Sequence, residues 1–518
     1  MLLRSEDLPR DIDYLIGLAV QLSAENEQLR EMVKSVNGFA FGARSERGDA
    51  ILPGQGILDL GDLEMGIVGA ANDDEPADDA RPTRKGARRN IGALPRHLER
   101  IERIIEPAAT DCPCCAGALH RIGEDSSEAF DWVPAILRVI RTIRPRYACR
   151  QCRNGVVQAS APKRMIEGGM TTTSTIAWIA TARFAWSIPL NRQVQMLAGQ
   201  GLVLDRSLFS GWMKRAAWWL EGLYELQMRF IHAQSRIFVD ETRMPVLEKG
   251  RTKVRISQFW AHACDDSGWN GPAPPAVCFV FAKGRGYQEI REQLAQFQGL
   301  LQVDGYAAYK SLEKARGLVR PIRLAFCLAH ARRKFVDVHK ATKSPVSAQI
   351  IALIARIYAV EAQVRGTSAE TRHAARQTES IAIMAQIKAV LDTTLPQLSA
   401  KSSLARAIRY MLAHWKGLWR FLDDGRLEAD TNTVERNMRT VAQGRKSSLF
   451  AGSEGGARTW AILSSLLQTA RLNGLDPYSW INDALERIVS GAVKNNELDQ
   501  LLAWNWRPGG QAAMAQAA

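Results

Sequence analysis

The feature that most constrains the fold is a run of strand-like segments that begins near Arg236. Before this point apolar residues recur at helical spacing, whereas after it short stretches rich in β-branched and aromatic residues follow one another between turns. The stretches predict three strands, a helix, a fourth strand, and a short strand that runs into a helix: RIFVDETRMPVL, KVRISQFWAHAC, PAVCFVFAKG, YQEIREQLAQF, GLLQVDGYAAY and RLAFCLAHARRKF. This order predicts an α/β core. Long helical segments interrupt the core from about Lys340 to Phe421, and EADTNTVERNMRTVAQGRKSSLFAG then resumes it.

The first of these strands carries two adjacent carboxylates, Asp240 and Glu241. Successive side chains of a strand point to opposite faces, so only one of the two can face a given site. Both faces of this strand are largely apolar, and alternation alone therefore does not choose between them. A solvated pair at a strand end is the alternative, because carboxylates are seldom fully buried.

Two further carboxylates, Asp304 and Glu435, are candidates to join Asp240 in a divalent-metal site. Phosphodiester chemistry with two metal ions needs oxygen ligands from separate elements of the fold. The predicted element order allows the first and fourth strands to lie side by side at the sheet centre, which would bring Asp240 near Asp304. Each candidate has an alternative role: Asp304 precedes Gly305 and can begin a turn, and Glu435 stands at capping-box spacing from Asn432.

The charge of the chain favours a polyanionic partner. Lys and Arg number 68 against 54 Asp and Glu, which gives a net charge of +14, and residues 81–170 hold 17 basic and 9 acidic residues, or +8 of that excess. Clustering of this kind favours nucleic acid. Four basic residues after Glu435 are candidate phosphate contacts: Arg436, Arg439, Arg445 and Lys446.

A second set of candidate DNA contacts lies in LDRSLFSGWMKRAAWWL, where a helix is expected to open after Asp205. Arg206, Lys214 and Arg215 share the polar sides of this helix. A helix, a Gly-containing turn and a second helix with basic side chains are typical of a helix-turn-helix. Generic helical packing is the alternative reading of the same pattern.

Five of the eight cysteines are concentrated between residues 112 and 152. Two Cys-x-x-Cys pairs, Cys112 with Cys115 and Cys149 with Cys152, are the usual way to present four thiolates to a structural zinc ion. Cys114 lies inside the first pair and is an alternative ligand. A redox-active dithiol is the other alternative, although no thioredoxin-like βαβ pattern surrounds the pairs.

The N-terminal residues have a heptad pattern that predicts a parallel coiled coil, with Leu8, Leu15, Leu22 and Leu29 seven residues apart and Asn26 at the alternate interior position. An amphipathic helix packed on its own chain is the alternative. The following stretch, with an acidic run and then a basic run, reads as a flexible linker. Neither a signal peptide nor a membrane span is expected, so the sequence predicts a cytoplasmic, nucleoid-associated protein.

At this point the sequence resembles a known family. CPCCAGAL, RIGEDSSEAFDWVPA, FVDET, LLQVDGYAAY, CLAHARRKF, VERNMR, GRKSSLFAGSEGG and NGLDPYSWI are similar, in order, to the large transposase of the insertion-sequence-66 family. The resemblance implies a DDE transposase with a ribonuclease-H-like catalytic core and with Asp240, Asp304 and Glu435 as its catalytic triad. It also implies Mg²⁺ at the triad, structural Zn²⁺, and DNA substrates comprising the element ends and the target.

The resemblance extends to the order of segments, which we expect to be as follows: coiled coil (1–47), linker (48–94), zinc-binding segment (95–165), helix-turn-helix-like segment (166–230), first part of the core (231–340), all-helical insertion (341–422), second part of the core (423–475) and C-terminal helical tail (476–518). A homodimer or higher oligomer and small accessory proteins are the expected protein partners.

The sequence departs from the family pattern at two places. Thr431 stands where the family usually has Asn, and the Gly pair after the first cysteine pair is reduced to Ala116-Gly117. Neither change removes a ligand. Cys327 and His330 resemble a short Cys-x-x-His motif found after the second Asp in several DDE families, for which packing is the slightly preferred reading. Two other functions remain open: an inactive, transposase-derived DNA-binding regulator, and a ribonuclease-H-like nuclease that acts on junctions or hybrids.

Overall fold

The computed structural model describes residues 161–508 apart from 249, 251–253 and 315–321, together with Ile140 and two short strands. The chain divides into two compact units, one of residues 67–159 and one of the remaining residues. The expected coiled coil, the linker and the four expected zinc ligands lie outside the described residues.

The described part of the smaller unit is a pair of antiparallel strands, β1 (Arg146–Ala148) and β2 (Val156–Gln158). Tyr147 is paired with Val157 at the centre of the ladder. The connecting residues 149–155 include one of the two Cys-x-x-Cys pairs. The second cysteine pair, Cys149 and Cys152, thus lies between β1 and β2 in the sequence.

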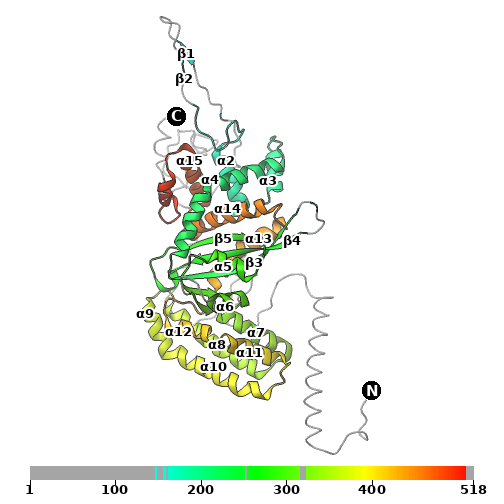
Figure 1. Cartoon of the computed structure of the whole chain (residues 1–518), viewed down its shortest axis with the longest axis vertical. Coiled ribbons are helices and arrows are strands. Elements are labelled where there is room, and N and C mark those ends of the chain that lie inside the picture. The colour runs from blue at the N-terminus through cyan, green and yellow to red at the C-terminus, as the bar shows by residue number, and fades with distance from the viewer. Residues whose placement is uncertain are drawn as a thin grey trace, which may run out of the picture. The chain divides into compact units, whose positions relative to one another are not determined.

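A five-stranded mixed sheet is the central layer of the larger unit (Figure 1). Its strands are β3 (Arg236–Val246), β4 (Arg255–Cys264), β5 (Ala276–Ala282), β6 (Gly299–Val303) and β7 (Ile322–Phe326). The strand order is β5-β4-β3-β6-β7, with β4 antiparallel to its neighbours β3 and β5, and β6 parallel to its neighbours β3 and β7. The predicted α/β pattern and the predicted adjacency of the first and fourth strands are confirmed.

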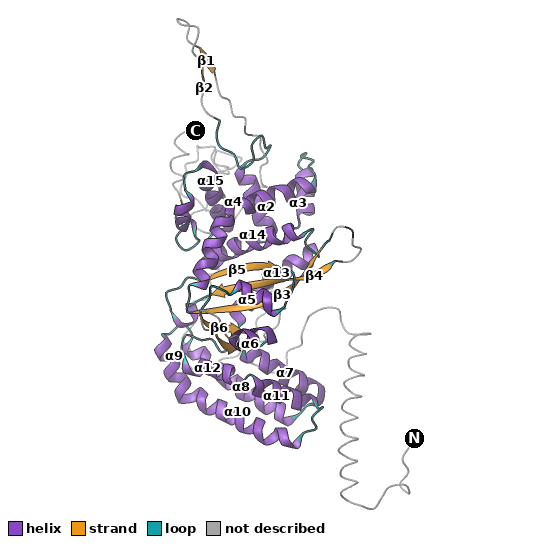
Figure 2. Ribbon diagram, viewed as in Figure 1, coloured by secondary structure: helices purple, strands orange, loops and turns teal. Residues whose placement is uncertain are grey.

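Helices cover both faces of this sheet (Figure 2). They are α5 (Tyr287–Gln293) and α6 (Ala307–Lys314) on one face and α13 (Asn432–Ser448) and α14 (Glu454–Leu472) on the other. Ile237 and Val239 of β3 belong to the core beside α5 and α6, whereas Phe238 and Met244 belong to the core beside α13 and α14. A strand that is covered on both faces has an almost continuous apolar sequence, which is why the sequence pattern of β3 does not show a polar face.

The edge strand β5 is covered by side chains of α14 and of α4 (Arg206–His232). Thr469 accepts the Val277 N–H at 3.0 Å, Gln227 donates to the Val277 carbonyl at 2.9 Å, and Tyr224 donates to the Phe279 carbonyl at 2.9 Å. Unpaired backbone groups on a sheet edge can recruit another strand. These side chains satisfy them within the chain.

A helical core lies beside the sheet, formed by α4 and α14 with α2 (Thr173–Phe184), α3 (Leu190–Ala198), α15 (Pro477–Ser490) and the 3₁₀ helix η6 (Asn495–Leu501). Phe209 and Leu220 of α4 share this core with Trp480 and Leu501 near the C-terminus. The expected helix start is confirmed, because the Asp205 side chain accepts the Ser207 N–H at 2.6 Å. The helices of 166–230 and those of 476–518 thus pack on one another.

The segment between β7 and α13 is helical throughout its regular elements, as predicted. These are α7 (Leu328–Thr342), α8 (Pro345–Val364), α9 (Ala369–Ala375), the π-helical turn η4 (Arg376–Ser380), α10 (Ile381–Thr394), the 3₁₀ turn η5 (Leu395–Gln397), α11 (Ser403–Ala413) and α12 (Trp415–Asp423). The helices α7, α8, α10, α11 and α12 share one apolar cluster, which also includes Leu300 of β6 and Ala325 of β7. The helical lobe is therefore packed on the β6–β7 side of the sheet (Figure 1).

Among the described helices, α8 alone is long and apolar enough to cross a membrane. Ile350, Ile354 and Ile357 of this helix are fully buried in the cluster shared with α7 and α10. Core packing therefore accounts for its apolar composition.

Candidate active site

Strand pairing places Asp240 and Asp304 level with one another. Phe238 of β3 is paired with Gln302 of the parallel strand β6, and each aspartate follows two residues later in its own chain segment. The Asp240 carboxylate accepts the Glu241 N–H at 2.8 Å, and the Asp304 carboxylate accepts the Tyr306 N–H at 2.8 Å. Asp304 therefore begins a turn, as the alternative reading proposed. Its charge also acts on Asp240, so both residues belong to one acidic centre.

Asp240 lies in an environment that disfavours its negative charge. Burial raises the pKa of this carboxyl well above its ordinary value, and the charges of Glu241, Asp304 and Glu435 raise it further, against a smaller opposite effect of the Glu241 N–H. The alternative of a solvated pair is wrong for Asp240 and Glu241, since the Glu241 side chain is only 2% exposed. Buried carboxylates that face one another need a cation or a proton between them.

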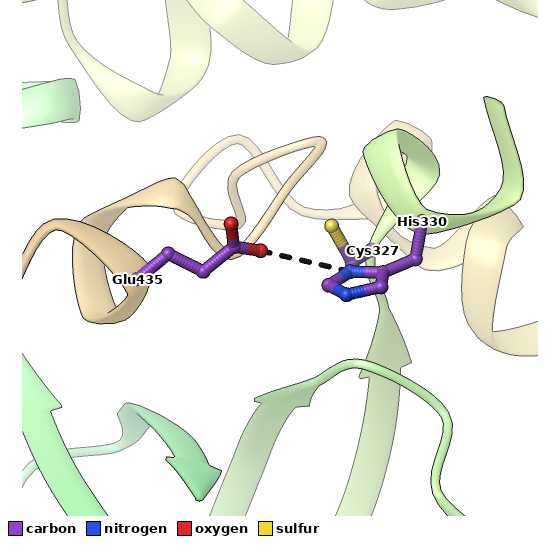
Figure 3. A group of neighbouring side chains, drawn as sticks. All are labelled: Cys327, His330 and Glu435. Atoms are coloured by element: carbon purple, nitrogen blue, oxygen red, sulfur yellow. Dashed lines mark ion pairs between the residues drawn. The ribbon is translucent and has the colours of Figure 1, made fainter. Parts of the chain in front are cut away.

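Glu435 lies in the first turn of α13 and completes the acidic group. The helix begins at Asn432, and Thr431 is its N-cap residue without a side-chain cap hydrogen bond. The capping-box alternative for Glu435 is therefore wrong. The side chain instead accepts a hydrogen bond from the Thr431 hydroxyl at 3.3 Å and forms an ion pair with Nδ1 of His330 at 3.6 Å (Figure 3).

Cys327 and His330 lie beside Glu435 but differ in character (Figure 3). Cys327 is buried, its sulfur accepts the Thr431 N–H at 3.3 Å, and burial raises the pKa of the thiol to about 12. These contacts agree with a packing role for Cys327. Burial lowers the pKa of His330, while the charges of Glu435 and Asp304 act in the opposite direction. One potential ligand atom from each of Cys327, His330 and Glu435 lies within 4.8 Å of the others.

Glu241 lies on the other side of β3 from Asp240, as strand alternation predicted. Arg285, in the loop after β5, donates from Nε to Glu241 Oε1 at 2.6 Å, and Nη2 lies 2.5 Å from the same oxygen. Tyr309 of α6 donates to the second carboxylate oxygen at 2.9 Å. Desolvation raises the pKa of Glu241, as does the charge of Asp304, and the contacts with Arg285 and Tyr309 lower it.

The helical lobe holds the turn that carries Asp304. Tyr410 of α11 donates to the Asp304 carbonyl at 2.9 Å, and Nε2 of His414 lies 3.1 Å from the Gly305 carbonyl. Gly305 has φ +98°, and a Cβ at this position would lie 2.8 Å from the His414 ring. The turn therefore needs glycine both for its backbone angle and for the close approach of His414.

A further carboxyl, Asp430, was not among the sequence predictions. Burial raises its pKa to about 6, and its oxygens accept the backbone N–H and the side-chain amide of Asn432 at 3.0 and 2.8 Å. Its position immediately before Thr431 was the available signal, since the family motif begins with an Asp. Tyr410 and His414 lack a comparable signal because they lie in the helical lobe, far from any motif.

The basic residues predicted after Glu435 lie along α13. Arg436 and Lys446 are exposed, whereas Arg439 and Arg445 are half-buried. Arg439 and Lys446 follow Glu435 at helical spacing and lie on the same side of the helix. Arg445 donates to the Arg243 carbonyl of β3, so this residue also ties α13 to the sheet.

The basic residues predicted in the helix-turn-helix-like segment lie in the N-terminal half of α4, and Arg206, Lys214 and Arg215 are all exposed. Arg215 also makes contacts within the chain. Its Nε donates to the Met165 carbonyl at 3.3 Å, and its guanidinium lies 4.3 Å from the centre of the Trp218 ring. The DNA contacts of all three residues stay predictions, as do the four zinc ligands Cys112, Cys115, Cys149 and Cys152.

The donor set at the centre fits a divalent cation of the Mg²⁺ type. Asp240, Asp304 and Glu435 supply hard carboxylate oxygens from a strand, a strand end and a helix, and the charges of Asp304 and Glu435 add to the effect of burial in raising the pKa of Asp240. Carboxylates from separate elements are the ligand set that two-metal phosphodiester chemistry requires.

Comparison with known proteins matches most of the chain to models of one family. Residues 168–459 match the model described as "Transposase IS66 family", and residues 109–153 match the "zinc-finger binding domain of transposase IS66". Residues 465–504 match the "IS66 C-terminal element", and residues 28–103 match "Transposase C of IS166 homeodomain".

Similar proteins of the same length occur in Sinorhizobium fredii (strain NBRC 101917 / NGR234). The chain is 52% identical to the uncharacterized protein y4jD over 99% of its own length and 100% of the relative. It is 39% identical to the uncharacterized protein y4qI, over 98% of this chain and 99% of the relative. With matched family models from the N-terminal segment to the last described helix, the chain belongs to the IS66 transposase family.

Proposed function

We propose that this chain is an active DDE transposase that binds the terminal inverted repeats of its element, cleaves the ends, and joins the freed 3′-hydroxyl to target DNA. The observation that carries the proposal is the convergence of Asp240, Asp304 and Glu435, three carboxylates from separate elements whose charges act on one another. A structural role does not explain why a chain would keep such repulsion in its core.

We further propose that the core is ribonuclease-H-like. The support is a mixed sheet in which three antiparallel strands precede two parallel ones, with Asp240 on β3 and Asp304 directly after the adjacent strand β6. The helical lobe would then be an insertion between the second and third acidic residues.

In the proposed reaction, a water oxygen attacks phosphorus in line and the 3′-oxygen of the element end leaves. The new 3′-hydroxyl then attacks the phosphorus of a target phosphodiester, which forms a bond to the target's 5′-phosphate while the 3′-oxygen of the preceding target nucleotide leaves. Asp240, Asp304 and Glu435 would hold Mg²⁺, which when bound supplies charge stabilisation of the attacking and leaving oxygens. Arg436, Arg439, Arg445 and Lys446 would contact phosphates and thereby position the strand.

Other parts of the chain would assemble the complex. We expect the segment with Cys112, Cys115, Cys149 and Cys152 to bind one structural Zn²⁺ and to contact the terminal repeats together with Arg206, Lys214 and Arg215 of α4. The N-terminal heptads would pair two chains, and thus two element ends. Metal analysis of the purified protein should find about one zinc per chain, and Cys149→Ser should release it.

The test of the proposed function uses the full chain, Mg²⁺ and duplex DNA that carries the element end. Cleavage with a free 3′-hydroxyl and subsequent strand joining are expected, and both should disappear in Asp240→Asn, Asp304→Asn and Glu435→Gln while end binding is retained. Glu241→Gln should keep measurable cleavage. Wild-type cleavage in any of the first three variants would remove that residue from the triad, and binding without cleavage by the wild-type chain would favour an inactive regulator.

A further inference from the structure

Four residues outside the triad form a connected group at its edge: Glu241, Arg285, Tyr306 and Tyr309. The Glu241 side chain is 2% exposed and takes all three of its side-chain hydrogen bonds and ion contacts from Arg285 and Tyr309. Arg285, by contrast, is 46% exposed. A buried carboxylate therefore holds a guanidinium that reaches solvent.

Tyr306 fixes the same arginine from a second side. The Arg285 guanidinium lies 3.8 Å from the centre of the Tyr306 ring, and the Tyr306 hydroxyl donates to the Arg285 carbonyl at 3.0 Å. Stacking on an aromatic face and a side-on carboxylate contact together restrict the orientation of a guanidinium. Arg285 is thus held in one orientation although it is half-exposed.

This group is next to the acidic centre. The backbone N–H of Tyr306 donates to the Asp304 carboxylate, and Glu241 directly follows Asp240 in β3. Partial burial lowers the pKa of Arg285, but the charge and hydrogen bond of Glu241, with smaller effects of Tyr306 and Asp304, raise it overall. Within the described residues, Nε and Nη2 of the Arg285 guanidinium contact Glu241, and Nη1 makes neither a hydrogen bond nor an ion pair.

We infer that Arg285 contacts a phosphate of the DNA strand held at the triad, and that Glu241, Tyr306 and Tyr309 are positioning residues for it. The inference rests on the proposed function and adds a residue to that site. A cluster of carboxylates repels a polyanionic strand, and a fixed guanidinium beside it offsets this repulsion. Arg is suited to the role because one edge of its fork can bind Glu241 while the rest of the fork binds phosphate oxygens.

The experiment has one readout that does not depend on cleavage. Binding of the element-end duplex to the full chain is measured in EDTA at several salt concentrations, and single-turnover cleavage is measured separately with Mg²⁺. Loss of one phosphate contact in Arg285→Ala should reduce the slope of log K against log salt by about 0.9. Removal of a preorganised charged donor should slow cleavage by about 100-fold.

The positioning role of Glu241 is tested by a double-mutant cycle. Glu241→Gln should slow cleavage less than Arg285→Ala, and the double variant should be no slower than Arg285→Ala alone, because Glu241 acts through the arginine. Multiplicative losses would show that Glu241 acts independently and would overturn its assignment. Arg458→Ala is the matched control, since Arg458 forms an ion pair with Glu221 outside the centre.

Arg285→Ala with the wild-type salt slope would overturn the phosphate contact, whether or not cleavage is slowed. If this variant does not fold, Arg285→Lys tests the same contact, because Lys keeps the charge but cannot bind both partners through a fork. Arg285→Lys should keep the salt slope of DNA binding and slow cleavage at least tenfold. Absence of cleavage by the wild-type chain contradicts the proposed function instead, and the slope measured in EDTA still tests Arg285.

Discussion

The hydroxyl of Thr431 donates to Oε1 of Glu435 at 3.3 Å, so the residue that departs from the usual family pattern contacts a proposed metal ligand. Thr431 is 2% exposed, and its backbone N–H is used separately by the Cys327 sulfur. The substitution thus keeps a hydrogen-bond donor beside Glu435. This contact accounts for why Thr is compatible with the site where the family usually has Asn.

Replacement of Thr431 by Val should weaken metal binding at the centre. Val keeps the volume and removes the hydroxyl, and loss of a group that orients a metal ligand typically costs about 10- to 100-fold in metal affinity or activity. We expect the Mg²⁺ concentration for half-maximal cleavage to rise about tenfold. Thr431→Asn is the control, because its amide can donate to Glu435, and an unchanged Mg²⁺ requirement in Thr431→Val would contradict the prediction.

Asp240→Asn should stabilise the metal-free protein. The folded-state pKa of Asp240 is raised, so the folded chain holds this proton more tightly than the unfolded chain, and ionisation opposes folding above the ordinary value of 3.8. Asn removes that charge. In EDTA at neutral pH we expect a higher Tm for Asp240→Asn than for the wild type, and a smaller increase of its Tm with Mg²⁺. Asp337→Asn, on the exposed side of α7, should change neither quantity; a lower Tm of Asp240→Asn in EDTA would rule out net repulsion.

A buried histidine, His262, and its half-buried neighbour His232 should make the free energy of unfolding fall in acid. His232 Nε2 lies 3.1 Å from His262 Nδ1, and burial, with the neighbouring ring, lowers the pKa of His232 to about 3. Burial lowers the pKa of His262 to about 4, against a hydrogen bond with Gln293. The unfolded chain therefore binds protons first. The loss of folding stability is absent above pH 6.5, the ordinary His pKa, and it grows as the pH falls toward 4 and then 3.

Urea unfolding at a series of pH values checks this expectation. At pH 5 the free energy of unfolding should be lower by at most about 2 kcal/mol per histidine. In the double variant His232→Gln/His262→Gln, the free energy of unfolding should change less between pH 6.5 and 5 than in the wild type, even if its maximum is lower. His373→Gln, at an exposed position of α9, should keep the wild-type dependence.

The fold of the helical lobe depends on a buried ion cluster around Glu361. Arg376 donates to both oxygens of Glu361 at 2.7 Å, and Arg372 joins Glu361 at 3.3 Å to Glu428 at 3.0 Å. Arg376→Met would leave Glu361 short of its main partner, and removal of one member of a buried pair costs about 3–5 kcal/mol. Hydrogen exchange should therefore increase across residues 345–423.

Two comparisons sharpen this prediction. Glu361→Leu/Arg376→Met should be less destabilised than Arg376→Met, because no carboxylate is then left unpaired and Arg372 keeps Glu428. Lys388→Ala removes an exposed pair with Asp392 and should cost less than about 1 kcal/mol. Equal effects of Lys388→Ala and Arg376→Met would show that burial of the cluster is unimportant.

The strands and the acidic centre were predictable because their signals are local. The apolar runs around Asp240 and Asp304 identify two strands, and the order of elements makes those strands neighbours. The ion pair between Glu241 and Arg285 was not predictable, because any exposed arginine on that side of the sheet satisfies the same pattern. His414 shows a second limit. The segment around it reads as continuous helix, but the ring packs on Gly305, and α11 and α12 separate at this residue.

The single helix α4 has a mechanical consequence for the proposed function, in which DNA would be recognised at one place and cut at another. Its 27 residues span about 40 Å without a break, from the exposed Arg206 to the backbone of the sheet that carries Asp240. A continuous helix of this kind fixes the distance between its two ends. The number of base pairs between the recognised sequence and the cut would then be set by the length of one rigid rod, and a lengthening of α4 would move the cut site in helical steps.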